Sequence, residues 1–121
     1  MRKILIATAC EATSTELSNA LSQYEVHVCN TGTAALAMLE TLRPDILILD
    51  LMLPIMDGLT VLRKSNFRPH TILACTNIIA AFVLQAAAEV GVQDVLLIPC
   101  SIRYIIKRLD ALTEKAPSAE S

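Results

Sequence analysis

Five short, mainly apolar runs, separated by longer segments, most constrain how this chain can fold. They span residues 4–7, 26–29, 46–49, 71–75 and 95–98. Successive positions within each run are suited to burial, so both faces of the run can be covered. Such runs are typical of parallel strands with helices on both sides. They therefore predict a parallel sheet of five strands.

Segments with apolar residues at a spacing of three or four separate these runs. They predict helices at residues 13–23, 33–42, 59–65, 78–90 and 101–112. Pro44 ends the second helix, and Gly91 follows the fourth as a C-terminal signal. The alternation of strand and helix predicts an α/β fold, a flavodoxin-like doubly wound sheet in the order 2-1-3-4-5 flanked by five helices.

The length of 121 residues corresponds to one domain. We expect that domain to span residues 1–114. The last seven residues, 115–121 (KAPSAES), are small and polar, and they predict a frayed end or a linker to an output domain. Hydrophobic residues make up 54% of the chain, more than one core of this size needs, so some apolar surface should pair with a partner.

Charge and composition exclude several classes of function. A net charge of −2 and an aromatic content of 3% argue against direct nucleic-acid binding. The apolar run at residues 4–9 is shorter than the roughly 7–15 residues of a signal-peptide core, and no run approaches the roughly 18 that span a bilayer. We expect a soluble, cytoplasmic protein without membrane contact.

Four cysteines, Cys10, Cys29, Cys75 and Cys100, lack the paired spacing of zinc or redox motifs. We expect them to be buried, reduced thiols, since free cysteine behaves as a small hydrophobic residue. His27 and His70 are expected to be structural or surface residues.

A lone aspartate, Asp50, closes the third apolar run. The third strand is central in the predicted sheet, and ligands collect at the carboxyl ends of strands in such sheets. A carboxylate at that place needs water, a cation or hydrogen-bond donors. Asp50 is therefore the leading candidate for a residue that is modified or that binds a cation.

The segment around Asp50, PDILILDLMLPIMDG at residues 44–58, resembles the phosphoacceptor strand and loop of the receiver domain of two-component response regulators nearly letter for letter. The resemblance covers residues 2 to about 113, and it includes Asn30-Thr31-Gly32, Thr76 and Pro99. It implies that Asp50 is the phosphoacceptor and that Thr76 is the switch hydroxyl that turns toward the phosphoryl group.

The resemblance also implies a function in two-component phosphorelay signalling. Such a module takes its phosphoryl group from a histidine kinase or phosphotransfer protein, and it controls an attached or partner output, expected to be transcriptional, through dimerisation. We do not expect an enzyme, because the sequence shows no nucleophile–base pair and no metal triad. No catalytic or metal-ligating residue is assigned.

Three positions depart from the family's pattern. The family has two adjacent acids after the first strand, which hold Mg²⁺, and a lysine before the last proline; here these are Thr8, Ala9 and Ile98. Mg²⁺ usually needs one or two carboxylates with waters and phosphate oxygens. We therefore expect an atypical, degenerate receiver with weakened Mg²⁺ binding and slowed autophosphorylation, since one electrostatic donor can be worth roughly 10²–10³ in rate.

Two other acids lie near the predicted site. Glu11 is a candidate substitute for the missing acids if the first loop swings it over Asp50; otherwise it is a solvated first-turn residue favoured by the helix dipole. Asp57 is expected to be a turn residue before Gly58 rather than a ligand.

The predicted helix at residues 78–90 carries a single charge, Glu89. A helix on a solvated sheet face normally has a polar stripe, so part of this helix is expected to be an interface. In the family, the surface of helix four, strand five and helix five is the usual dimer face. We expect a homodimer there, with charges on helix five setting its register. The candidate interface residues are Ile79, Phe82, Val83, Arg103, Lys107 and Arg108.

Other functions remain open at this stage. One is a phosphorylation-independent protein-interaction module. A flavodoxin-like binding protein would use the hydroxyls of the loop TACEATST, residues 8–15, to cradle a phosphate. A thiol sensor would use Cys10 and Cys100, which flank the predicted site.

Overall fold

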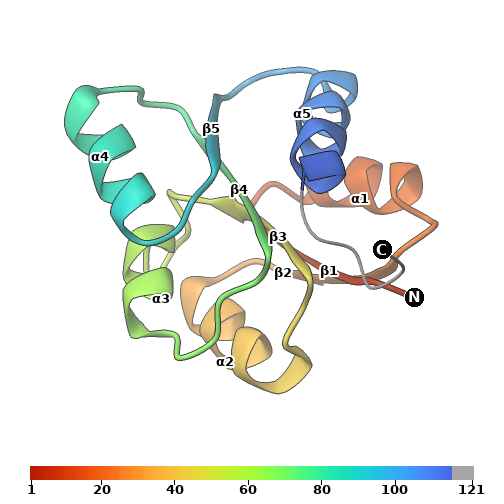
Figure 1. The fold of residues 1–121 in the computed structure, drawn as a ribbon, viewed down its shortest axis with the longest axis horizontal. Helices are drawn as coiled ribbons and strands as arrows, with labels where there is room; N and C mark the ends of the chain where they lie inside the picture. The colour runs from red at the N-terminus through yellow and green to blue at the C-terminus, as the bar shows by residue number, and fades with distance from the viewer. Residues whose placement is uncertain (116–121) are drawn as a thin grey trace.

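The computed structural model describes residues 1–115 (Figure 1). The expected tail, 115–121, lies outside these described residues apart from Lys115, the last residue of the final helix. The elements in order are β1 (Lys3–Ala7), α1 (Glu11–Ala20), β2 (Glu25–Cys29), α2 (Gly32–Leu42), β3 (Ile46–Asp50), α3 (Gly58–Lys64), β4 (Thr71–Thr76), α4 (Ala81–Glu89), β5 (Asp94–Leu97) and α5 (Ile102–Lys115).

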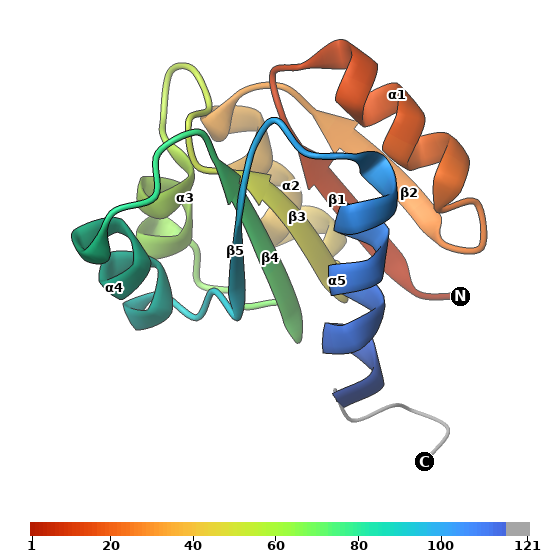
Figure 2. The same ribbon diagram turned by 90° about the horizontal axis from the view of Figure 1, so that it is seen from above.

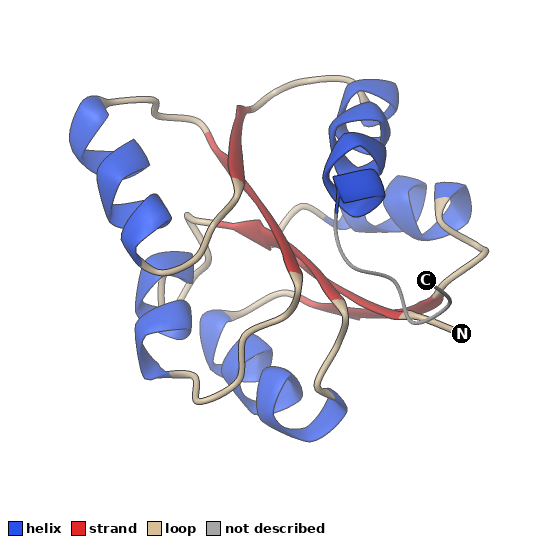
Figure 3. Ribbon diagram, viewed as in Figure 1, coloured by secondary structure: helices blue, strands red, loops and turns tan. Residues whose placement is uncertain are grey.

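The five strands form one parallel sheet in the order β2-β1-β3-β4-β5, with helices on both sides (Figure 3). The fold class, the strand order and the five helices are confirmed. Asp50 is the last residue of the central strand, opposite Cys75 of β4. The sheet therefore places the aspartate at its carboxyl edge, as the sequence predicted.

Alternating side chains build two cores, one on each face of the sheet. Helices α1 and α5 cover one face, and α2, α3 and α4 cover the other (Figures 1 and 2). On β3, Leu47 and Leu49 join the core under α2 and α3, whereas Ile46 and Ile48 join the core under α1 and α5. Because side chains alternate along a strand, Asp50 continues the second series and faces the α1–α5 side.

Helix α4 begins at Ala81, three residues later than the sequence predicted. The hydroxyl of Thr76 accepts a hydrogen bond from the backbone N–H of Ile78 at 3.2 Å. Such local bonds compete with helix formation, and the side chain of the N-cap Ala80 makes no capping hydrogen bond. The expected helix at 78–90 is therefore wrong at its beginning, and Ile78 and Ile79 lie on a loop.

Helix α1 is also displaced from its predicted range of 13–23. It begins at Glu11 after the N-cap Cys10, and it ends at Ala20. Residues 21–23 form a turn, which lets Leu21 reach the core with 0% exposure. The spacing of apolar residues continues through that turn, and for this reason the predicted helix extended beyond Ala20.

The loop after β3 is fixed against the start of α2. The backbone N–H of Gly32 donates to the Pro54 carbonyl at 3.1 Å. A Cβ atom at residue 32 would lie 1.7 Å from the carbonyl oxygen of Met56, so only glycine fits. The loop that follows Asp50 is thus held by a contact with the first residue of α2, which lies earlier in the chain.

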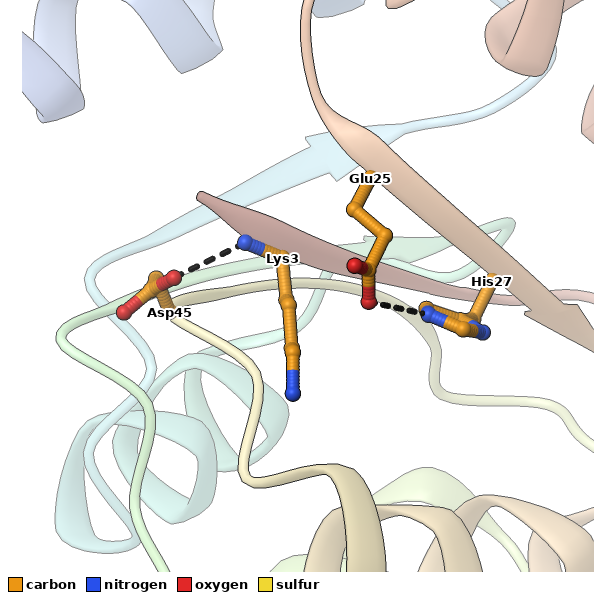
Figure 4. A network of polar contacts seen from close by, with 4 residues as sticks. All are labelled: Lys3, Glu25, His27 and Asp45. Atoms are coloured by element: carbon orange, nitrogen blue, oxygen red, sulfur yellow. Dashed lines mark hydrogen bonds and ion pairs between the residues drawn. The ribbon is translucent and has the colours of Figure 1, made fainter. Parts of the chain in front are cut away.

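The opposite edge of the sheet carries polar contacts that have no link to Asp50 (Figure 4). Asp45 accepts from the backbone N–H of Lys3 at 2.8 Å, and His27 contacts Glu25 at 2.8 Å within β2. The hydrogen bond to His27 is the main reason that the pKa of Glu25 is lowered. His27 is thus a strand residue with a local partner, as expected.

Within residues 1–115, no helix combines the length and the apolar character that crossing a membrane requires.

Candidate functional site

Asp50 lies where β1, β3 and β4 end, and backbone and side chain both hold its carboxylate. Its Oδ1 accepts a hydrogen bond from the backbone N–H of Met52 at 2.8 Å. Its Oδ2 is 3.5 Å from the hydroxyl of Thr8, at the limit of a hydrogen bond. One carboxylate oxygen is thus well bonded, and the other keeps most of its capacity to accept.

A cavity of about 330 Å³ opens beside this carboxylate, between the strand ends and the helices α1 and α5. We call it the Asp50 cavity. Most of its wall is apolar, and the polar groups are a few hydroxyl, amide, thiol and carboxylate side chains. Its lining residues are Ile6, Ala7, Thr8, Cys10, Thr13, Leu17, Ile48, Asp50, Cys75, Asn77, Ile98, Pro99, Cys100 and Ile105.

The donor set around Asp50 does not fit a ready-made Mg²⁺ site. The cavity offers one carboxylate, from Asp50, with the Thr8 hydroxyl and the Asn77 amide nearby. Nowhere in residues 1–115 do three side chains of the metal-binding types gather closely enough to hold an ion. Mg²⁺ favours one or two carboxylates with waters and phosphate oxygens. The wall of this cavity supplies a single carboxylate, the smallest number in that range.

The two other acids lie outside the Asp50 cavity. Glu11 is exposed in the first turn of α1 and borders a separate recess, with Val28 and Asn30, on the β2 side of the first loop. Asp57 is the N-cap of α3 and accepts from the backbone N–H and the hydroxyl of Thr60, at 3.0 and 2.8 Å. Burial raises the pKa of Asp57, but these hydrogen bonds together hold it below its ordinary value.

Thr76, the expected switch residue, ends β4 with 2% exposure. Its hydroxyl is bonded to the backbone of Ile78, and it does not line the Asp50 cavity. The neighbouring Asn77 does line it. In this structure the Thr76 hydroxyl therefore stabilises the loop before α4.

Three of the four cysteines line the Asp50 cavity, but they differ in exposure. Only Cys75 is buried, and Cys10 is exposed, so the expectation of four buried thiols is wrong. Cys10 precedes α1, outside the sheet, and a hydrogen bond from the Thr13 hydroxyl at 3.2 Å lowers its pKa. Burial raises the pKa of Cys75 to about 12 and that of Cys29 to about 11.

The sequence did not indicate that the pKa of Cys10 would be lowered, because the predicted helix began at residue 13. Cys10 directly precedes α1, and a helix N-terminus favours a thiolate. The hydroxyls of the same loop are engaged locally. Thr13 donates to the Cys10 sulfur and Ser14 to the Glu11 carbonyl, which leaves Thr8 beside Asp50.

Apolar side chains are exposed on α4 and on the loop that precedes it. Phe82 is 74% exposed and Ile79 is 43% exposed, whereas Val83 packs partly against the core. Arg108, a candidate interface residue, forms an ion pair with Asp94 of β5 within the same chain. Helix α5 lies along β5, and this brings the guanidinium of Arg108 next to the carboxylate of Asp94.

The other two charges predicted for the interface lie elsewhere on α5. Arg103 and Lys107 are exposed and border a recess that includes Ala20 of α1. Their side of α5 faces α1, not α4. A contact through α4 would therefore rest mainly on apolar side chains.

The family model of the response regulator receiver domain matches residues 4–110 of the chain. The chain belongs to this family. Receiver domains of response regulators are signalling modules, not enzymes, in agreement with the prediction from sequence. The strand order and the five helices are thus those of a receiver.

The receiver is similar to longer response regulators. Response regulator MprA of Mycobacterium tuberculosis (strain ATCC 25618 / H37Rv) is 31% identical over 128 residues, covering 98% of this chain and 55% of that protein. Response regulator MprA of Mycobacterium leprae is 33% identical over 105 residues, covering 81% of this chain and 45% of that protein. The chain spans about half the length of these curated relatives.

Solved structures show the same fold. The chemotaxis response regulator CheY4 of Vibrio cholerae is 25% identical with a TM-score of 0.81, covering 93% of this chain and 98% of that chain. The non-phosphorylated receiver domain of HemR from Leptospira biflexa is 20% identical with a TM-score of 0.83, covering 98% of each chain. The second similarity is one of fold alone.

Proposed function

We propose that this chain is an atypical receiver in two-component phosphorelay signalling, with Asp50 as its phosphoacceptor. The supporting observation is the carboxylate at the end of the central strand, whose Oδ2 faces a cavity with only a 3.5 Å contact to Thr8. That oxygen is available as a nucleophile toward a phosphodonor. Its kinase or phosphotransfer partner would supply the phosphoryl group.

The same surroundings support slow phosphorylation. Phosphoryl transfer is accelerated by groups that neutralise charge as it develops. Thr8, Ala9 and Ile98 stand where the family's pattern has two acids and a lysine, and none of them carries charge. We infer that this receiver reacts more slowly than one with the complete set.

The test is phosphorylation by a small-molecule phosphodonor with Mg²⁺, followed by intact mass over time. We expect the protein to gain one phosphoryl group, about 10²-fold or more slowly than a receiver with the complete acid set. Asp50→Ala should gain none. Asp57→Ala is the matched control, because it removes an acid of the same loop that caps α3, and it should react like the unmodified chain.

The proposal of a phosphoacceptor would be withdrawn if the unmodified chain gained nothing while the reference receiver reacted. A gain that persisted in Asp50→Ala would also contradict it. The first result would favour the phosphorylation-independent module, in which the receiver signals by binding alone.

We further propose that the receiver forms a homodimer through α4, β5 and α5. By dimerising, it would control an output that acts in transcription, either an attached domain or a separate partner. The support is the apolar surface of Phe82, Ile79 and Leu84, which are 74%, 43% and 42% exposed. Large exposed apolar patches mark interaction sites. Leu97 at the end of β5, 53% exposed, extends the apolar surface from β5.

Phe82→Asp should abolish the dimer. Placing a charge in an apolar interface leaves it desolvated without a partner, so we expect the dimer dissociation constant to rise by about 100-fold or more. Sedimentation equilibrium over a range of protein concentrations measures it. Val28→Asp is the matched control, because Val28 is 48% exposed on the far strand β2. This interface would be contradicted if the unmodified chain were monomeric at all concentrations. It would also be contradicted if Val28→Asp weakened the dimer as much as Phe82→Asp does.

A further inference from the structure

The Asp50 cavity has the size and wall of a site for a small molecule. Its volume of about 330 Å³ is roughly twice that of an apolar cavity that holds benzene, and it lies in the range of ligand pockets, roughly 300–1,000 Å³. Apolar side chains from both layers form its wall, among them Ile6 and Ile48 from the sheet and Leu17 and Ile105 from α1 and α5. An aromatic ring with a short chain would fill this space.

One charged group lies in this apolar wall, and no cation accompanies it. No lysine, arginine or histidine lines the cavity, and Asp50 takes part in no ion pair among residues 1–115. The thiols of Cys75 and Cys100 add no charge of their own, because burial raises the pKa of both and keeps them protonated. A carboxylate has about four acceptor positions, and the Met52 N–H uses one of them at 2.8 Å.

An apolar wall with one uncompensated carboxylate selects its ligand by charge. A cation forms an ion pair with Asp50, whereas an anion is repelled and a neutral molecule can at most donate a hydrogen bond without balancing the charge. We propose that the Asp50 cavity binds a small organic cation, an amine whose ring-sized apolar body lies between α1 and α5 and whose protonated nitrogen donates to Asp50 Oδ2.

This binding goes beyond phosphorylation and does not depend on it. The amine would occupy the oxygen that a phosphodonor must approach, so amine and phosphoryl group would exclude one another. The receiver would then respond to the concentration of a small molecule through the same residue that a kinase addresses.

The experiment titrates the protein with three probes of similar shape in the absence of Mg²⁺ and phosphodonor. 2-Phenylethylamine is the cation, 2-phenylethanol the neutral analogue and 3-phenylpropionate the anion, and chemical-shift changes of the isoleucine methyl groups give each dissociation constant. We expect saturable binding of the amine, about tenfold or more tighter than the alcohol, because both probes can donate to the carboxylate but only the amine adds the attraction of an ion pair. The carboxylate should bind weakest.

Two pairs of variants locate the site. Asp50→Asn should bring the amine to the affinity of the alcohol, whereas Asp57→Asn, outside the cavity, should leave the preference unchanged. Cys100→Leu should weaken the binding of all three probes by filling the cavity. If Cys100→Leu does not fold, Cys10→Leu at the exposed rim of the cavity replaces it. The proposal would be overturned if the amine showed no saturable binding, or if amine and alcohol bound with equal affinity. It would also be overturned if both Asp50→Asn and the leucine variant left binding of the amine intact.

Discussion

Replacing Thr8 and Ala9 by aspartate and Ile98 by lysine should accelerate phosphorylation of Asp50 by about 10²–10³-fold. The Thr8 hydroxyl is 3.5 Å from Asp50 Oδ2, so a carboxylate at residue 8 would lie beside the existing one. The added carboxylates would supply oxygen ligands that Mg²⁺ takes together with waters and phosphate oxygens. Ile98 lines the same cavity, and a lysine there would place a cation near the transferred phosphoryl group.

The rate is followed by intact mass after adding a small-molecule phosphodonor, with Mg²⁺ varied. The same three substitutions combined with Asp50→Ala should not react, which assigns the gain to that residue. Ile98→Lys alone should give a smaller gain with little dependence on Mg²⁺. If the triple variant folds and reacts at the rate of the unmodified chain, the missing charges are not the cause of slow transfer.

Stability should fall steeply in alkali because of one buried thiol. Cys75 is 7% exposed, and burial raises its pKa from 9.0 to about 12. Above pH 9 the unfolded chain ionises this thiol while the folded chain keeps the proton. Ionisation therefore favours the unfolded state, and the free energy of unfolding should drop by about 3 kcal/mol between pH 8 and pH 11 from this residue alone.

The drop is measured by urea unfolding, followed by circular dichroism, at pH 8 and pH 11. Cys75→Ala removes the thiol, and the free energy of unfolding of this variant should fall by about 3 kcal/mol less over that interval. Cys10→Ala is the matched control, because this exposed thiol has a lowered pKa and should not share the effect. An equal drop in Cys75→Ala and in the unmodified chain would show that the buried thiol is not responsible.

The sheet was predictable from the sequence because its signals are short and strong. Runs such as Ile46–Leu49 are apolar on both faces, and only a strand covered on both sides buries them. Helix ends were less predictable. Apolar spacing continues past Ala20 and starts before Ala81, and the actual ends depend on local hydrogen bonds such as that of the Thr76 hydroxyl.

The candidate site was predictable only as a position on the sheet. The run that ends at Asp50 indicated the carboxyl edge, and the β-sheet places it there. The cavity could not be predicted, because it forms where α1 and α5 meet the strand ends. The ion pair of Arg108 with Asp94 joins residues 14 apart and depends on how α5 lies along β5.

The contact of Gly32 with the Met56 carbonyl restricts how this chain can be diversified. Any side chain at residue 32 displaces the loop that Pro54 and Met56 anchor, and with it the backbone that leads away from Asp50. A combinatorial library that randomises residues 51–57 must therefore keep glycine at residue 32. Conversely, a library of α2 that changes residue 32 would alter the chemistry at Asp50 without touching a residue of its cavity.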